Sequence, residues 1–246
     1  MKKILSIALV CAMLLSLAAC GTKADEKSEG SLTYAEYVAA ELDTEVTIEG
    51  FVQSCAYAEA YGNASLFLAD GSGAYYIYRM GVTAEEAAKL TEGTKIKVTG
   101  TKSEWAGETE VIDVTSFEFL SGSYKAKAAD VTKLFGDDDA LAAYINQKVS
   151  FKGLTVEASK DADGNEAAFL YSWDGSGAEG SNSDLYFNVS LNGVTCSFTV
   201  ESDEVAEGEA AYTAVTELAV GQTVTVEGYL YWYNGPQLHV YSVSAK

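Results

Sequence analysis

Apolar and polar residues along this chain follow one pattern twice. The stretch from Leu90 to Gly107 returns between Leu218 and Gly235 at a constant offset of 128 residues, with leucine, glycine and β-branched positions matched and no gap. Each stretch predicts the end of a helix, a turn, an alternating strand and a loop. A second pair of alternating strands, residues 45–51 and 148–154, matches in the same way. The chain is therefore predicted to contain two copies of one small β-module.

The order of the predicted elements in each copy is that of an OB-fold. In the first copy, Thr33 with Glu36 predicts a capped helix, and an Asp-Gly pair at Asp70 predicts a hairpin between the second and third strands. A helix capped by Thr83 separates the third strand from the fourth. This interposed helix disfavours the rival architecture, an immunoglobulin-type β-sandwich. The expected fold is all-β with short helices, in two tandem OB-fold-like five-stranded Greek-key barrels.

The second copy is longer than the first. The four residues 174–177 repeat the Asp-Gly-Ser-Gly sequence of residues 70–73, so the extra residues are placed between Gly177 and Leu218. They include two alternating strands around Asn192-Gly193, a pair that favours a type I′ hairpin turn. The second barrel is therefore expected to carry an inserted hairpin.

The N-terminus carries an export pattern. Residues 1–19 combine two lysines, an apolar run too short to span a bilayer comfortably, and small residues at the end, which is typical of a secretory signal. Residues 20–32 are small, polar and charged after Cys20, which predicts a lipidated cysteine and a disordered tether. The remaining expected boundaries are 33–120 for module 1, 121–136 for the linker and 137–246 for module 2.

Two segments of the chain resemble known protein families. Leu17-Ala18-Ala19-Cys20, followed by Gly21, resembles the lipobox of bacterial lipoproteins. It implies cleavage before Cys20, a lipid on its thiol and a location on the extracytoplasmic face of the cell membrane; the alternative is an ordinary signal with a bystander cysteine. Residues 33–246 resemble the tandem OB-fold lipoproteins of Gram-positive gut bacteria, through the segments DTEVTIEG, LADGSG, LTEGTKIKVTG, NQKVSFKG and LYWYNG. The resemblance implies the fold and the location and supplies no catalytic residue.

Charge and motif content restrict the functions to be considered. The formal net charge is -20, and Arg79 is the only arginine. Such a field repels phosphates, so nucleic acid is predicted not to be a partner. The single histidine, His239, lies on a late strand and is expected to be structural. The sequence has no CxxC, P-loop, HExxH, GxSxG or dinucleotide fingerprint, so neither an enzyme nor a cofactor is predicted.

Aromatic residues mark the expected ligand-binding surface. OB-folds commonly bind oligonucleotides or oligosaccharides across strands two and three, between the loops that join strands 1–2 and strands 4–5. Outward aromatic rings there can stack on sugar rings, whereas rings that cap the barrel ends or fill the module interface are the more conservative interpretation. The candidate residues are Tyr57, Tyr61, Tyr76, Tyr78, Trp105, Trp173, Trp232, Tyr233 and Asn234.

Two further clusters are open to alternative interpretations. Alternating acids at residues 161–166 could hold Ca²⁺ through oxygen ligands, but the spacing of an EF-hand loop is absent and a plain polar hairpin is favoured. No metal site is therefore predicted. Cys55 and Cys196 remain once Cys11 and Cys20 are assigned to the signal and the lipid. Export permits a disulfide between them, but their non-equivalent positions favour two separate thiols.

The function expected from these observations is a surface-anchored, non-catalytic binding lipoprotein. Its partners are the membrane, through the lipid anchor, and a glycan or an envelope or secreted protein. The alternative is a structural or assembly subunit of an envelope complex with no small ligand.

Overall fold

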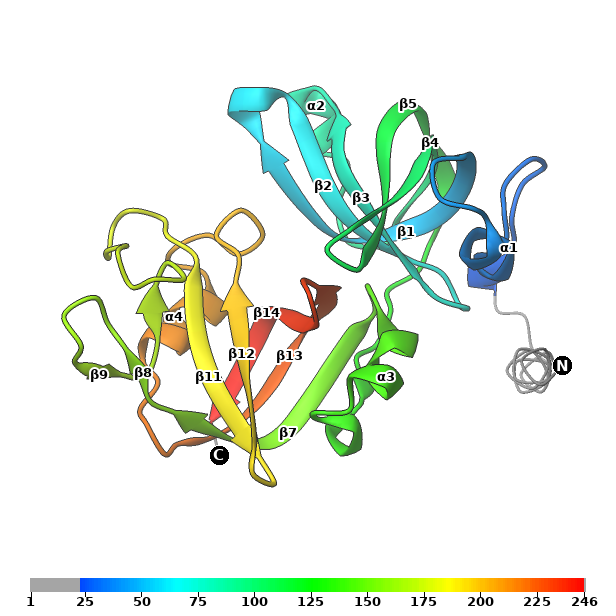
Figure 1. Cartoon of the computed structure of the whole chain (residues 1–246). Helices are drawn as coiled ribbons and strands as arrows, with labels where there is room; N and C mark the ends of the chain where they lie inside the picture. The colour runs from blue at the N-terminus through cyan, green and yellow to red at the C-terminus, as the bar shows by residue number, and fades with distance from the viewer. Residues whose placement is uncertain (1–22, 246) are drawn as a thin grey trace, which may run out of the picture.

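The computed structural model describes residues 23–245 and shows two β-barrels in contact (Figure 1). The predicted secretory signal and Cys20, the predicted lipidation site, lie outside the described residues. In the first barrel, five strands close in the order β1-β2-β3-β5-β4. Strand β3 runs parallel to β5, and the other neighbouring pairs are antiparallel. The strands are β1 (Glu45–Ala58), β2 (Asn63–Ala69), β3 (Ala74–Gly81), β4 (Thr94–Trp105) and β5 (Glu108–Ser123).

The second barrel has the same strand order. Strand β11 pairs with β7 as well as with β12, which closes the ring β7-β11-β12-β14-β13. Again the third and fifth strands, β12 and β14, run parallel. The strands are β7 (Lys148–Glu157), β11 (Leu185–Leu191), β12 (Val194–Val200), β13 (Thr223–Trp232) and β14 (Pro236–Ala245). This closure and order confirm the prediction of two OB-fold-like barrels.

Helices lie where the capping patterns predict them. Both Thr33 and Thr83 form complete capping boxes, with Glu36 and Glu86 as the partners. Helices α2 and α4 separate the third and fourth strands of their barrels. The helical elements are η2 (Lys23–Asp25), α1 (Tyr34–Ala39), η3 (Glu59–Tyr61), α2 (Ala84–Ala87), η4 (Thr132–Leu134), α3 (Asp138–Leu141), η5 (Ala142–Tyr144) and α4 (Ala210–Thr216). None of the helices in the described part of the chain has the length and apolar character needed to traverse a lipid bilayer.

One pair of matched glycines shows that the two barrels bend alike. A Cβ on Gly100 would lie 2.7 Å from the carbonyl oxygen of Ile112, and a Cβ on Gly228 would lie 2.5 Å from that of His239. The register of the fourth strand against the fifth shifts at both places. Only glycine allows this close backbone approach, so the repeat seen in the sequence has a common steric cause.

Each barrel has its own apolar core, built from inward-facing strand residues. The core of the first barrel includes Ile48, Leu66, Ile77 and Val98, and that of the second includes Phe151, Phe187, Val226 and Leu238. A third and smaller cluster joins the barrels and consists of Phe67, Tyr76, Tyr229 and Tyr231.

The inserted hairpin is present in the second barrel, but not where the sequence pattern places it. The strands around Asn192-Gly193 are β11 and β12, the second and third strands of the barrel itself. Both turn residues have positive φ angles (53° and 84°), as a type I′ turn requires. The additional hairpin is β8 (Ser159–Lys160) with β9 (Glu166–Ala167), in the long segment between β7 and β11 that also contains β10 (Leu170–Tyr171).

The part of the expected tether that the structure describes is not disordered. Lys27 forms an ion pair with Asp70 (2.5 Å) and donates to the carbonyl oxygen of Glu49 (2.6 Å). The fully buried carboxylate of Glu49 accepts hydrogen bonds from Ser28 and Ser31. Because these contacts satisfy buried polar groups of the barrel, residues 27–31 are held against it, whereas composition alone predicted a flexible segment.

The segment between the barrels is also structured in part. Residues 121–123 continue β5, and β6 (Ala129–Asp130) pairs with β7 in parallel. The short element η4 lies just before Gly136, which has a φ of 82°. The connection is therefore partly built into the two sheets.

Candidate ligand-binding pocket between the two barrels

The first barrel meets the second through the outer face of β2 and β3. Phe67 of β2 stacks on Tyr229 of β13 with ring centroids 4.5 Å apart and planes 7° apart. Tyr76 of β3 makes an edge contact with Tyr231 (5.3 Å), and the Tyr229 hydroxyl donates to the carbonyl oxygen of Gln53 (2.7 Å). The outward aromatics of this part of the OB-fold face are therefore covered by the partner barrel.

A second contact joins the turns between the fourth and fifth strands. Glu108 is fully buried and accepts hydrogen bonds from the Asn146 side chain (2.7 Å) and the Trp232 backbone N–H (2.9 Å). The Asn234 N–H donates to the carbonyl oxygen of Ala106 (2.7 Å). Burial raises the pKa of Glu108 to about 8, against the effect of both donors. We call this polar contact between the barrels the clasp; it is formed by Ala106, Glu108, Asn146, Trp232 and Asn234.

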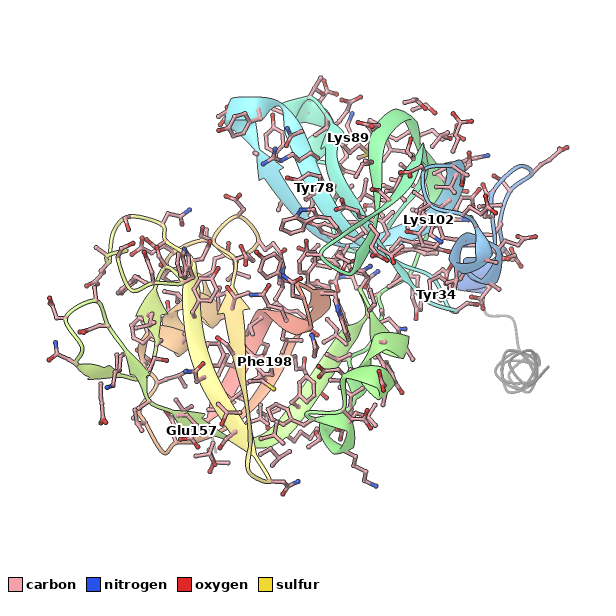
Figure 2. The ribbon with its side chains drawn as sticks, viewed as in Figure 1. Tyr34, Tyr78, Lys89, Lys102, Glu157 and Phe198 are labelled. Carbon is pink, nitrogen blue, oxygen red and sulfur yellow. The ribbon has the colours of Figure 1, made fainter. Side chains whose placement is uncertain are left out.

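The rest of the β2–β3 face borders a pocket of about 190 Å³ between the barrels. One wall is formed in the first barrel by the end of the face nearest η3 and the end of β1. The other is formed in the second barrel by the segment that follows β12 and by His239 of β14. Figure 2 labels Tyr78 on the strand of the first barrel that contributes to this pocket. The residues that line it are Ala56, Ala58, Tyr61, Asn63, Ser65, Tyr76, Tyr78, Arg79, Glu201, Asp203, Glu204 and His239.

The wall from the first barrel is aromatic and carries one cation. The side chain of Tyr61 is 79% exposed, and that of Tyr78 is 38% exposed. The Arg79 guanidinium lies over the Tyr78 ring, 4.9 Å from its centroid. Arg79 has a φ of 51°, a left-handed conformation that is strained for a residue other than glycine. Such strain often persists at binding sites, where the surrounding structure imposes it.

The wall from the second barrel is acidic. His239 Nδ1 lies 2.8 Å from a Glu204 carboxylate oxygen, and its Nε2 lies 3.9 Å from Glu201. Burial alone would lower the pKa of His239, but the Glu204 carboxylate outweighs it and raises the pKa above its usual value. Burial raises the pKa of Glu201 to about 7. Asp203 is exposed at the rim. Glu204 therefore has His239 as a hydrogen-bond partner, while Asp203 forms no ion pair within the described residues and Glu201 lies 3.9 Å from the same histidine.

This arrangement suits non-covalent recognition. Aromatic rings offer faces for stacking, and the amide, hydroxyl, guanidinium and carboxylate groups around them offer donors and acceptors for a polar ligand. A mostly concave site with a few convergent polar groups is the usual form of a small-ligand site. Among residues 23–245, no group of three or more His, Cys, Asp or Glu side chains is placed to hold a metal ion.

The structure divides the predicted site residues into two groups and leaves two residues apart. Tyr61, Tyr76 and Tyr78 line the pocket. Trp105 and Tyr233 form a half-exposed ring pair at 5.2 Å beside the clasp, next to Trp232 and Asn234. Tyr57 is half-buried against the core of the first barrel, and Trp173 is 76% exposed in the β10–β11 segment, far along the chain from the other candidates.

Sequence reasoning missed the acidic wall. Glu201, Asp203 and Glu204 lie among many other acids in the sequence, so no pattern distinguishes them. Arg79 carried a usable signal, because it is the single arginine and follows a candidate tyrosine directly. His239 is buried and hydrogen-bonded, as expected of a structural histidine, and it also lines the pocket.

The other two sequence clusters have simple structures. Asp161 accepts hydrogen bonds from the backbone N–H groups of Asp163 and Asn165, which closes the turn of the β8–β9 hairpin. Cys55 and Cys196 are free thiols in separate barrels. Burial raises the pKa of the Cys55 thiol to about 11, so it is protonated at neutral pH.

Comparisons with known proteins return structures alone. No family model matches the chain, and no curated protein matches it. A deletion mutant of the single-stranded DNA-binding protein from Thermus aquaticus matches with a TM-score of 0.25 and 16% identity over 82% of this chain and 93% of that one. A replication protein A heterotrimer bound to ssDNA matches with a TM-score of 0.29 and 10% identity over 90% of this chain and 70% of that one. The asparaginyl-tRNA synthetase of Entamoeba histolytica matches with a TM-score of 0.30 and 18% identity over 43% of this chain, which spans only 29% of the synthetase.

These comparisons correct one prediction from the sequence. Net charge predicts that nucleic acid is not a partner, and the similar structures contradict that prediction. Two of the similar structures are a single-stranded DNA-binding protein and a protein bound to ssDNA. Net charge describes the far field of the whole chain, whereas a ligand meets local groups such as Arg79 and the exposed tyrosines. The fold assignment rests on the order and closure of the strands.

Proposed function

We propose that this chain is a lipid-anchored, non-catalytic binding protein of the extracytoplasmic membrane face, and that it binds the end of a glycan in the pocket between its barrels. The observation that carries the proposal is the pocket itself, which is lined by the exposed rings of Tyr61 and Tyr78 together with the polar groups of Arg79, Glu201 and Asp203. Rings of this kind stack on the apolar faces of sugars, while carboxylate and amide groups bind the hydroxyls.

The position of the pocket supports a binding role. It occupies the end of the β2–β3 face that OB-folds commonly use, next to the connection between strands one and two. The other end of the face is covered by Tyr229 and Tyr231. A ligand in the remaining space is limited to a short stretch, so we propose a terminal sugar and not the middle of a long polymer.

The anchoring part of the proposal rests on the sequence. Residues 17–21 resemble a lipobox, and the apolar run before them is typical of an export signal. Replacing Cys20 with serine should move the protein from the membrane fraction to the soluble fraction, and metabolic labelling with a fatty acid should be lost. Unchanged membrane association and labelling would contradict the lipid anchor without affecting the pocket.

Glycan-array profiling of the mature chain tests the ligand. We expect binding to a subset of glycan ends, and loss of that binding in Tyr78→Ala. Trp173→Ala is the matched control, because Trp173 is exposed but lies outside the pocket. An array of single-stranded oligonucleotides is profiled in parallel. Binding to oligonucleotides alone, or glycan binding that survives Tyr78→Ala, would contradict the proposal.

A structural role in an envelope complex is the second candidate. It is favoured by the covered β2–β3 face, because the surface used by many OB-folds here joins two modules of one chain. Affinity capture of the mature protein from cross-linked membranes would recover a stoichiometric partner if this role is correct. If the role is structural, the capture survives Tyr78→Ala. If the partner is held through a glycan in the pocket, the same substitution abolishes the capture.

A further inference from the structure

The two walls of the pocket carry opposite charges that do not pair with each other. Arg79 lies on the wall from the first barrel, and Glu201 and Asp203 lie on the wall from the second. Within residues 23–245, Arg79 forms no ion pair with any carboxylate, although it lines the same pocket as three of them. These groups line a pocket of about 190 Å³, which gives a small ligand space to contact both walls.

The position of Arg79 is fixed locally. Its backbone N–H donates to the Ser65 hydroxyl (3.2 Å), and its guanidinium stacks on the Tyr78 ring. The pairing of β2 with β3 shifts register between Ala64 and Leu66, opposite this residue. Stacking leaves the edge of a guanidinium free to donate, and its planar fork matches a carboxylate.

The acidic wall is also arranged so that some of its charge is available. Glu204 is hydrogen-bonded to His239, which occupies one of its carboxylate oxygens. Glu201 receives only a 3.3 Å hydrogen bond from Thr199 and a distant His239 nitrogen. Asp203 forms no ion pair within the described residues. An ammonium group donates charge-assisted hydrogen bonds to carboxylates, and such bonds are stronger than those between neutral groups.

We infer that the pocket selects a ligand that carries an ammonium and a carboxylate together, with the carboxylate on Arg79 and the ammonium on Glu201 and Asp203. This inference rests on the proposed function and names its ligand class as a zwitterionic sugar end, an amino sugar that also bears an acid group. A neutral sugar would leave both walls uncompensated. A sugar with a single charge would satisfy one wall and bring no partner to the other.

Four monosaccharides separate the contributions of the two charges. Glucose carries neither, glucosamine carries the amine, glucuronic acid carries the acid, and muramic acid carries both. Isothermal titration of the mature protein with each sugar at low ionic strength is the measurement. Muramic acid is expected to bind at least about tenfold more tightly than glucosamine or glucuronic acid, since a charge-assisted hydrogen bond contributes about that factor.

Variants of each wall identify the group responsible. Arg79→Gln should remove the advantage of muramic acid over glucosamine and keep the advantage of glucosamine over glucose. Glu201→Gln combined with Asp203→Asn should remove the advantage of glucosamine over glucose and keep the advantage of muramic acid over glucosamine. Lys89→Gln and Glu85→Gln are matched controls, because they remove an exposed cation and an exposed acid in and beside α2, away from the pocket. Circular dichroism confirms that each variant is folded.

The outcomes distinguish this inference from the proposed function. Equal affinity for glucose and muramic acid would overturn the charge selection while leaving a glycan-binding pocket in place. Unchanged muramic acid affinity in Arg79→Gln would overturn it as well. Failure of all four sugars to bind, together with silence on a glycan array, would overturn the proposed function and this inference with it.

Discussion

The rings of Phe67 and Tyr229 lie face to face, 4.5 Å apart and within 7° of parallel, although they belong to different barrels. This stack turns a surface that a lone OB-fold would present to solvent into an interface between modules. The same arrangement brings the wall that contains Glu201 opposite the wall that contains Tyr78 and Arg79. The pocket therefore exists only while the two barrels stay in contact.

The first prediction concerns that stack. Tyr229→Ala should lower the free energy of unfolding by about 3 kcal/mol, because a large buried aromatic side chain is lost from a packed cluster. Tyr229→Phe keeps the stack and removes only the hydrogen bond to Gln53, so it should cost about 1 kcal/mol. Urea unfolding followed by tyrosine and tryptophan fluorescence measures both. Equal effects of the two substitutions would show that the hydroxyl, and not the stack, holds the barrels together.

The second prediction concerns the clasp. A Cβ on Gly107 would lie 2.5 Å from the Trp232 ring, and Gly107 has a φ of 93°. Gly107→Ala therefore combines backbone strain with a clash between the barrels. Gly164→Ala is the matched control, because Gly164 has a similar φ of 84° and nothing within 4 Å of the added Cβ. Both should lose about 1 kcal/mol to strain, and Gly107→Ala should lose about 1–3 kcal/mol more to overpacking. Thermal unfolding that shows no difference between the two variants would contradict the contact with Trp232.

The third prediction is a pH dependence with a definite sign. Glu108 has a pKa of about 8 in the folded chain against 4.5 for an exposed carboxyl, because it is buried at the clasp. The folded state therefore holds a proton that the unfolded state has released, so its contribution to stability is complete below about pH 4.5 and is lost as the pH rises to about 8. Glu201 and His239 also have raised pKa values and act in the same direction.

Glu108→Gln isolates this contribution from that of the other groups. The difference in unfolding free energy between the wild-type protein and the variant should change steadily between pH 4.5 and pH 8 and stay constant above that range. Chemical denaturation across this range is the measurement. A difference that does not vary with pH would show that Glu108 does not titrate there.

The fourth prediction has the opposite sign and concerns the first barrel alone. Burial would raise the pKa of Glu49, but hydrogen bonds from Lys95, Ser28 and Ser31 lower it to about 2. Its contribution to stability is present above about pH 4.5 and is lost as the pH falls towards 2. Glu49→Gln should cost about 1–3 kcal/mol at neutral pH, because the donors of residues 28–31 lose a charged acceptor.

Acid titration of the Glu49→Gln protein tests the role of this charge. Its deficit relative to the wild-type protein should shrink as the pH falls through the same range. Glu85→Gln is the control, since that carboxylate is exposed on α2 and should change stability by less than about 0.5 kcal/mol. A deficit that is equal at pH 7 and pH 2 would mean that Glu49 acts through packing and not through charge.

The fold could be predicted from the sequence because the repeated glycines have a steric cause. Gly100 and Gly228 occupy the same bend of the fourth strand, so their spacing reports the geometry of both barrels. The turn motif at residues 70–73 and 174–177 was less informative. Asp70 and Asp174 both accept hydrogen bonds from the backbone N–H two residues later, yet one turn joins β2 to β3 and the other lies in the segment before β11. Local turn chemistry does not specify which strands it connects, and the inserted hairpin was misplaced for this reason.

The pocket was predictable only in part. The aromatic candidates Tyr61, Tyr76 and Tyr78 follow from the known binding face of OB-folds. The acidic wall depends on how the second barrel docks, which is set by contacts such as Phe67 with Tyr229 that leave no periodic signal in the sequence. The buried role of residues 27–31 was missed because polar composition favours disorder unless the barrel offers buried charges such as Glu49 and Asp70 as partners.

A nuclear magnetic resonance titration of the mature, isotope-labelled protein with muramic acid tests the central claim most directly. We predict that backbone shifts change for the residues that line the pocket on both walls, including Asn63, Arg79 and Glu201, and that these changes are lost in Tyr78→Ala. Shifts confined to the outer face of β11 and β12 or to the segment around Trp173 would place the ligand elsewhere and contradict the pocket between the barrels as the binding site.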